Sequence, residues 1–114
     1  MIVHYSELNI RTLSRIQGAD LEHGRHLTCV LGAISKDWYK FGRMLNFSHE
    51  QLLSVHHHSG PDPEECCRAV FSKWIDDGGS SVYPVTWESI FRLLEVTQYN
   101  QLADELRKAL MYMV

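Results

Sequence analysis

The stretch SVHHHSGPDPEECC gathers three consecutive histidines, at positions 56–58, and the adjacent cysteines Cys66 and Cys67. Imidazoles and thiolates bind structural zinc, which needs four ligands that converge tetrahedrally, usually from spaced pairs. Adjacent residues on a helix point about 100° apart, so the two thiols diverge on the helix expected there. Three histidines in a row likewise do not converge on one ion from regular structure. The spacing favours buried thiols and solvated loop histidines, with metal binding as a minor alternative.

Cysteine catalysis requires an exposed thiol, a histidine within hydrogen-bond reach, and a group that orients this histidine. Both cysteines fall in the first turns of the expected helix, where the helix N-terminus lowers a thiol pKa. They also fall on its apolar stripe, where a free cysteine behaves as a small hydrophobic residue. The glycines at 78 and 79 do not form a phosphate loop, because no lysine follows them at the motif spacing. We therefore predict no enzymatic activity, no catalytic residue, no bound metal and no cofactor.

The composition is that of an ordinary globular domain. The chain has 114 residues, enough for one core without disulfide or metal support. A net charge of −3 argues against nucleic-acid binding, and no apolar run approaches the roughly 18–20 residues of a membrane helix. Three cysteines with one adjacent pair make a poor disulfide framework, and no signal peptide is visible. We expect a cytoplasmic protein with no nucleic-acid partner, no membrane insertion and no small-molecule substrate.

Apolar residues recur at helical spacing along the chain, which predicts an all-α fold. The first clear stripe is one long helix, or two nearly collinear helices with a break at Ser35. It consists of Leu27, Leu31, Ile34, Trp38, Phe41 and Leu45. Ser48 and Gln51 form a capping box for a short second helix, with Phe47 stapling against Leu52. On that helix we expect Leu52, Leu53 and Val55 to face inward.

The later helices have equally legible ends. Asp62 is the expected N-cap of a helix with Pro63 at its first position, and Thr86 caps a helix that begins at Trp87. The helix after Asp62 carries two inward rows, Cys66–Val70–Trp74 and Cys67–Phe71–Ile75, and ends at Gly78 or Gly79. The next buries Trp87, Ile90, Phe91 and Leu94. The last carries Tyr99, Leu102, Ala103, Leu106, Leu110 and Met113, with a solvated polar face of Asp104, Glu105, Arg107 and Lys108. We expect Trp38, Trp74 and Trp87 to pack in the core.

The exposed charges form separate basic and acidic groups. Lys36, Lys40 and Arg43 follow one another at i, i+4 and i+7, which predicts a basic ridge on the first helix. Acidic residues gather at both ends of the helix that begins at Pro63. The simplest interpretation of each group is a solvated helical face. Separated patches of opposite charge are also what association between like domains requires.

The ordered segments DWYKFGRMLNFSHEQLLSV, EECCRAVFSKWI and TWESIFRLLEVTQYNQLADELRKAL resemble a death domain of the death-fold superfamily. The resemblance covers residues 25–113 and implies a six-helix antiparallel Greek-key bundle without catalytic activity. It further implies binding to other death domains, or self-association, in apoptotic or innate-immune signalling assemblies. The third helix, expected near residues 57–61, is reduced to HHHSGP and is at most a turn. Residues 25–114 would form the bundle, and residues 1–24 an extension with a helix at 6–17.

The resemblance also implies which residues contact a partner. One pairing would set Lys36, Lys40, Arg43 and Arg68 against His49, Glu50, Asp62 and Glu64, and a second would use Asp76 and Asp77. The alternative function is that of a structural helical domain of a larger protein that binds an unrelated partner. A small metal-binding or thiol-active protein is the third possibility.

Overall fold

The computed structural model describes Ile16 and residues 25–111, and every regular element in this part of the chain is helical. The elements are α3 (Arg25–Ile34), the 3₁₀ turn η1 (Ser35–Asp37), α4 (Trp38–Met44), α5 (His49–Ser59), α6 (Pro63–Asp76), α7 (Trp87–Val96) and α8 (Asn100–Met111). The all-α fold is confirmed. The helix expected at 6–17 lies, apart from Ile16, outside the described residues, as do the side chains of Leu110 and Met113.

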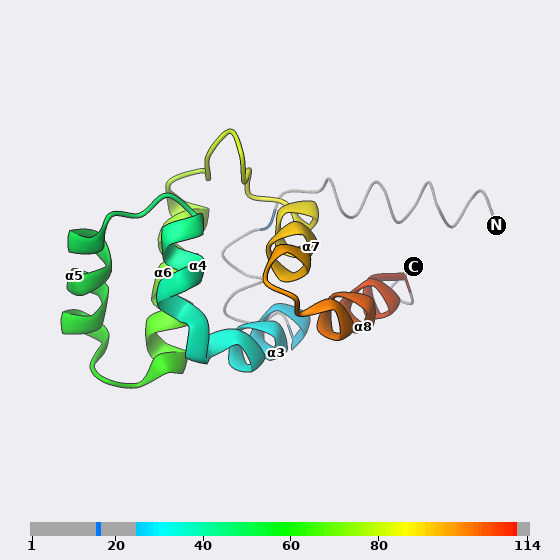
Figure 1. Ribbon diagram of the computed structural model, residues 1–114, viewed down its shortest axis with the longest axis horizontal. Helices are drawn as coiled ribbons and strands as arrows, with labels where there is room; N and C mark the ends of the chain where they lie inside the picture. The colour runs from blue at the N-terminus through cyan, green and yellow to red at the C-terminus, as the bar shows by residue number, and fades with distance from the viewer. Residues whose placement is uncertain (1–15, 17–24, 112–114) are drawn as a thin grey trace.

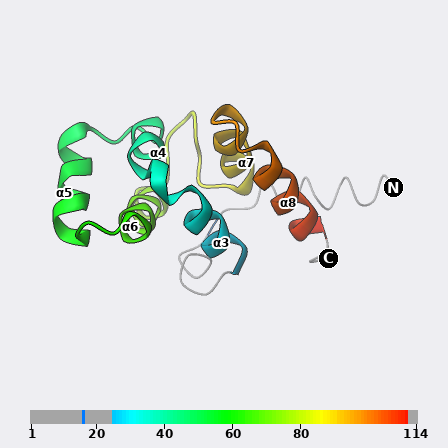
Figure 2. The ribbon, with the colours of Figure 1, turned by 60° about the horizontal axis from the view of Figure 1, so that its bottom comes forward.

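Helix α6 is the central element of the domain. It packs against α3, η1, α4 and α5, whereas α7 packs on α8 and α8 packs on α3. Figure 1 shows α5 beside α4 and α6 at one end of the molecule, with α7, α8 and α3 at the other. Figure 2 shows from a second direction that α3 and α8 lie together. The first and last described helices therefore close the fold.

The first apolar stripe continues through a break, as predicted. The hydroxyl of Ser35 donates to the carbonyl oxygen of Gly32 at 3.0 Å, and the chain passes through η1 before α4 begins. A serine that bonds back to the preceding turn in this way competes with the helical ladder. One stripe therefore serves two helices that are set at an angle.

Helix α5 is longer than the sequence analysis predicted. It runs through all three histidines to Ser59 and ends at Gly60, which has a φ of +78°. Histidines in a last turn suit the negative end of the helix dipole, which favours this extension. The described residues contain no third helix of the family pattern, because only positions 60–62 separate α5 from α6. The histidines are thus helical and exposed, and their placement in a loop was wrong.

The predicted N-caps are confirmed. The amide of Gln51 donates to the Ser48 hydroxyl at 3.1 Å, and the Ser48 amide donates to the Gln51 side-chain oxygen at 2.8 Å. Asp62 accepts from the amide of Glu64, and Thr86 accepts from the amide of Ser89. These caps satisfy amides that the first helical turn leaves without a partner. Short polar signals thus define where three helices begin.

Three helices end in the same way, each with a residue of positive φ at the second position after its last helical residue. These residues are Asn46 after α4, Gly78 after α6 and Gln98 after α7. At the end of α6, the amide of Gly78 donates to Ile75 and the amide of Gly79 donates to Trp74. This crossed pair of bonds is the Schellman motif, which satisfies the carbonyl groups of the last turn. The predicted stop at Gly78 or Gly79 is confirmed.

Burial confirms both inward rows of α6. Cys66, Val70 and Trp74, and beside them Cys67, Phe71 and Ile75, all belong to one core. Trp38 and Trp87 are only half-buried, so of the three tryptophans Trp74 alone is fully buried. Leu53 was expected to face inward and is 53% exposed. It follows the buried Leu52 by one position, and a 100° step carries it away from the core.

One hydrogen bond ties the start of α8 to η1. The Tyr99 hydroxyl donates to Oδ2 of Asp37 at 2.6 Å, across 62 sequence positions. Burial, and then this bond to Asp37, raises the pKa of Tyr99 to about 12. The phenol therefore keeps its proton, and its role as the donor, throughout the neutral range.

Candidate partner-binding surfaces

The predicted basic ridge consists of Lys36, Lys40 and Arg43. Lys36 lies on η1 and the other two lie on α4, and all three side chains are exposed. None of them forms an ion pair or a side-chain hydrogen bond with another described residue. Exposed cations of this kind attract acidic surfaces and set the orientation in which those surfaces dock. The ridge thus offers three uncommitted donors.

Arg68, which was grouped with this ridge, lies elsewhere. It is half-buried on α6 and lines a cleft of about 70 Å³ against α3, together with Glu64 and Glu65. Two carboxylates beside it lower the positive potential that a partner would meet there. The structure therefore places Arg68 with acidic neighbours, and the ridge is formed by η1 and α4.

The predicted acidic surface is divided into two groups. His49 and Glu50 occupy the first turn of α5, whereas Asp62 and Glu64 begin α6 beyond the other end of α5. All four side chains are exposed. A helix of 11 residues is about 16 Å long, which keeps the two groups apart.

Aromatic contacts between α4 and α5 were missed by the sequence analysis. Oη of Tyr39 and Nδ1 of His49 share a hydrogen bond of 2.5 Å, and the indole of Trp38 stacks on His56 with ring centroids 6.3 Å apart. The exposed Leu53 lies between the two histidines on the helix surface, at i+4 from one and i−3 from the other. We call Trp38, Tyr39, His49 and His56 the aromatic seam. Tyrosine and tryptophan are the residue types most enriched where interfaces are strongest.

Asp76 and Asp77, predicted for a second contact, are both exposed at the end of α6. The loop that follows projects from the body of the molecule between α6 and α7 (Figure 1). Its backbone is braced from both sides: the indole N–H of Trp74 donates to the Tyr83 carbonyl at 2.9 Å, and Arg92 donates to the Val82 carbonyl at 3.0 Å. Val82 is 56% exposed on this loop. The bracing therefore holds an apolar side chain in the loop that follows the two aspartates.

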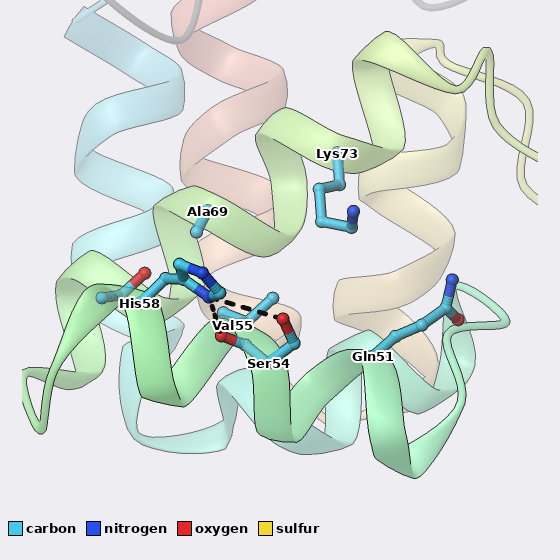
Figure 3. A pocket seen from close by; sticks show the side chains of 7 residues that line it. Gln51, Ser54, Val55, His58, Ala69 and Lys73 are labelled. Carbon is cyan, nitrogen blue, oxygen red and sulfur yellow. Dashed lines mark hydrogen bonds between the residues drawn. The ribbon is translucent and has the colours of Figure 1, made fainter.

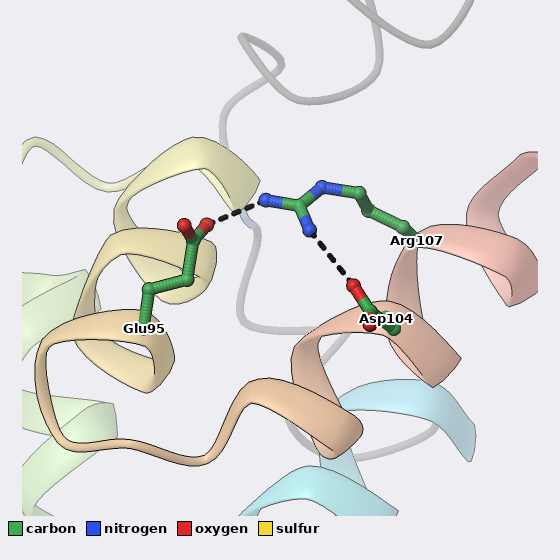
Figure 4. Close-up of polar contacts among 3 residues, drawn as sticks. All are labelled: Glu95, Asp104 and Arg107. Carbon is green, nitrogen blue, oxygen red and sulfur yellow. Dashed lines mark hydrogen bonds and ion pairs between the residues drawn. The ribbon is translucent and has the colours of Figure 1, made fainter.

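Three of the four side chains on the predicted polar face of α8 are exposed, as expected, and Arg107 is half-buried. The guanidinium of Arg107 donates to Glu95 on α7 and to Asp104 (Figure 4). It also lies 4.8 Å from the centroid of the Phe91 ring. These charged side chains are between 38% and 69% exposed, so the ion pairs contribute little free energy. These ion pairs engage the Arg107 guanidinium within the domain.

The adjacent thiols have the environment of core residues. Cys66 and Cys67 are 0% exposed, and the Cys66 thiol donates to the Gly60 carbonyl at 3.4 Å. Burial, and then the neighbouring Cys66, raises the pKa of Cys67 to about 12, and burial likewise raises that of Cys66. Reactive cysteines have a lowered pKa instead. Within the described residues, no group of three or more His, Cys, Asp or Glu side chains is arranged to hold a metal ion.

The three cysteines should react at clearly different rates in a labelling experiment. In the native protein, Ellman's reagent or a maleimide should react rapidly at the exposed Cys29, whereas Cys66 and Cys67 react only after unfolding. Mass spectrometry of the labelled peptides identifies the sites, and Cys29→Ser should remove the fast phase. The pKa of Cys67 is raised in the folded protein, so the unfolded state loses this proton first as the pH rises. The stability that the buried, protonated thiol contributes is therefore complete below about pH 9 and is lost as the pH approaches 12. Rapid native labelling of Cys66 would contradict the buried arrangement.

Comparison with known proteins supports one family. The death-domain family model matches residues 24–110, which is more than half of the chain. No curated protein and no solved structure is similar enough to the chain to count as a match. No helix among residues 25–111 is long and apolar enough to cross a bilayer. The chain therefore belongs to the death-domain family, whose members are protein-interaction modules in signalling that bind other death-fold proteins.

Proposed function

We propose that this domain joins other death domains, or further copies of itself, in cytoplasmic signalling assemblies of the apoptotic or innate-immune type. It would act as an adaptor or receptor module without catalysis. The observation that carries the proposal is the basic ridge, whose three cations are exposed and make no ion pair among the described residues. An acidic group on a second domain is the complementary surface.

The partner's surface would be one of the two groups into which the predicted acidic surface is divided. Glu50 offers one carboxylate at the start of α5, and Asp62 and Glu64 offer two at the start of α6. The start of α6 is the better match for three cations, because it concentrates more negative charge at one place. In self-association, the ridge of one copy would then contact the start of α6 in the next. A contact between two different surfaces of the same chain continues from copy to copy.

A second contact would use Asp76, Asp77 and the braced loop with Val82. Two carboxylates supply charge, and the exposed valine supplies apolar area that is held in place before binding. A preorganised loop loses less conformational entropy on association than a mobile one. This second surface would allow one domain to bind several neighbours at once.

Charge reversal on the ridge tests the proposal. Lys40→Glu should abolish association with a death-domain partner and leave the helical circular dichroism spectrum unchanged, because Lys40 is exposed. Self-association is measured by light scattering over concentration and salt, and other partners by co-precipitation of death-domain proteins from lysate. Association of the parent should weaken with salt, since screening at about 0.15 M acts over roughly 8 Å.

Lys108→Glu is the matched control, because this lysine is also exposed but lies on α8. It changes the net charge by the same amount and should leave association unaffected. If Lys40→Glu associates as well as the parent does, the ridge is not part of the interface.

A further inference from the structure

A groove opens between α5 and α6, on the side of α5 away from the aromatic seam. Its volume is about 370 Å³, and its lining includes Gln51, Ser54, Val55 and His58 from α5 and Ala69 and Lys73 from α6 (Figure 3). The two helices contact each other directly, because no third helix separates them in the described chain. A connection of only three residues, 60–62, joins the two helices that form the groove.

The imidazole of His58 is fixed in the groove. Its Nδ1 lies 2.8 Å from the carbonyl oxygen of Ser54, and the Ser54 hydroxyl is 3.4 Å from the same nitrogen. A carbonyl oxygen only accepts, so Nδ1 carries the proton and donates. The remaining nitrogen, Nε2, is then the atom left for a ligand, and it becomes a second donor when the ring is protonated. The ring of His57 lies beside that of His58, with ring centroids 5.6 Å apart, and Lys73 lines the same groove from α6.

Lys73 supplies a permanent positive charge. Figure 3 shows its side chain extending from α6 into the space between the helices, above Ser54 and Gln51. It makes no ion pair or side-chain hydrogen bond with any residue in the described part of the chain. An ammonium group at the wall of a groove favours an anionic ligand, and a carboxylate or phosphate oxygen pairs with it most strongly.

The length and the floor of the groove indicate the shape of the ligand. In an extended polypeptide, side chains on alternate residues point the same way and repeat about every 6.4–6.8 Å. The lining from position 51 to 58 spans about 10 Å, enough for three extended residues. Val55 and Ala69 add an apolar floor, which a peptide backbone covers better than a small ion does.

We propose that this groove binds a short extended acidic segment of another polypeptide, with one carboxylate at Lys73 and a second at His58. The site is separate from the basic ridge, so it does not depend on the proposed death-domain pairing. The positions Gln51, Ser54 and His58 face one side of α5, whereas His49 and His56 of the aromatic seam face the other.

An NMR titration of the ¹⁵N-labelled protein with the capped peptide Ser-Glu-Ser-Glu-Ser tests the proposal. At pH 6 and low salt, shift changes should concentrate at amides 51–59 and 69–73. Lys73→Glu should lose these changes, and Lys73→Gln should weaken them. His57→Ala is the matched control and should retain them, because His57 is exposed and does not line the groove. The dispersion of each variant's spectrum reports that it is folded.

Three results would overturn the proposal. The first is an equal response to Ser-Gln-Ser-Gln-Ser, and the second is an equal response to acetate or inorganic phosphate at the same anion concentration. The third is a set of shift changes confined to the basic ridge, or unchanged by Lys73→Glu. Lys40→Glu separates the two sites, because it removes death-domain association under the proposed function and leaves the groove response intact.

Discussion

Replacing Trp74 by alanine should cost about 3–5 kcal/mol in the free energy of unfolding. The side chain is 1% exposed and is among the largest fully buried side chains. Its ring meets Phe71 edge-on with centroids 5.8 Å apart, and its N–H donates to the Tyr83 carbonyl. The substitution therefore opens a cavity and also leaves a loop carbonyl without its donor. Small domains have only about 5–15 kcal/mol of stability, so a domain at the lower end of that range would be left close to unfolding.

Thermal and urea unfolding followed by circular dichroism measure this loss. Trp74→Phe is the informative companion, because it keeps a buried ring and removes only the indole N–H and part of the volume. Its loss should fall between those of the parent and the alanine variant. An unchanged melting temperature for Trp74→Ala would mean that the indole is not a core residue.

Alanine at Gly79 should destabilise the domain much more than alanine at the adjacent Gly78. Both glycines have positive φ, +77° and +82°, so each substitution incurs the strain of a left-handed residue, about 1–2 kcal/mol. A Cβ at Gly78 meets nothing within 4 Å. A Cβ at Gly79 would lie 2.7 Å from the Tyr83 carbonyl oxygen and 3.0 Å from the amide nitrogen of Val85. Backbone atoms cannot rotate away as a side chain does, so the braced loop has to open.

Urea denaturation of the two variants measures the difference. Gly78→Ala should lose about 1–2 kcal/mol, and Gly79→Ala at least about twice that. Because the same loop carries the second proposed contact, Gly79→Ala should also weaken association through Asp76 and Asp77. Equal losses for the two variants would show that the loop adapts without strain.

The helix ends could be predicted because their signals are local. Ser48 with Gln51, Asp62 before Pro63, and Thr86 act within one turn, so the chain near each cap determines where the helix begins. The rows of α6 were equally predictable, because a helix buried along one side repeats every three to four residues. The all-α fold and the family follow from these patterns.

The errors concern contacts between helices and the length of α5. The burial of Leu53 was wrong because an apolar residue beside the stripe is exposed or buried according to which neighbour packs there. Arg107 was assigned to solvent, and its contacts with Glu95 and Phe91 depend on how α7 lies against α8. The extent of α5 depends on bonds within its last turn, such as that of His58 to Ser54, which a periodicity analysis does not see.

The candidate surfaces also differ in whether the sequence could predict them. The basic ridge was predictable because Lys36, Lys40 and Arg43 lie on consecutive turns and require no tertiary information. The aromatic seam and the groove at Lys73 were not, because each joins residues from two helices. Whether the ten predicted contact residues bind a partner stays a prediction.

The pairing of α3 with α8 determines how the domain responds to force. The two helices run in opposite directions (Figure 2), and the bond between Asp37 and Tyr99 lies where α3 ends and α8 begins. The start of α3 and the end of α8 therefore lie together at the other end of the pair. Tension applied at Arg25 and Met111 would separate the two helices progressively, one turn at a time, and would load few contacts at once. A domain arranged in this way would unfold at low force when it is pulled from these two ends. The Asp37–Tyr99 bond would be the last contact between the two segments to break.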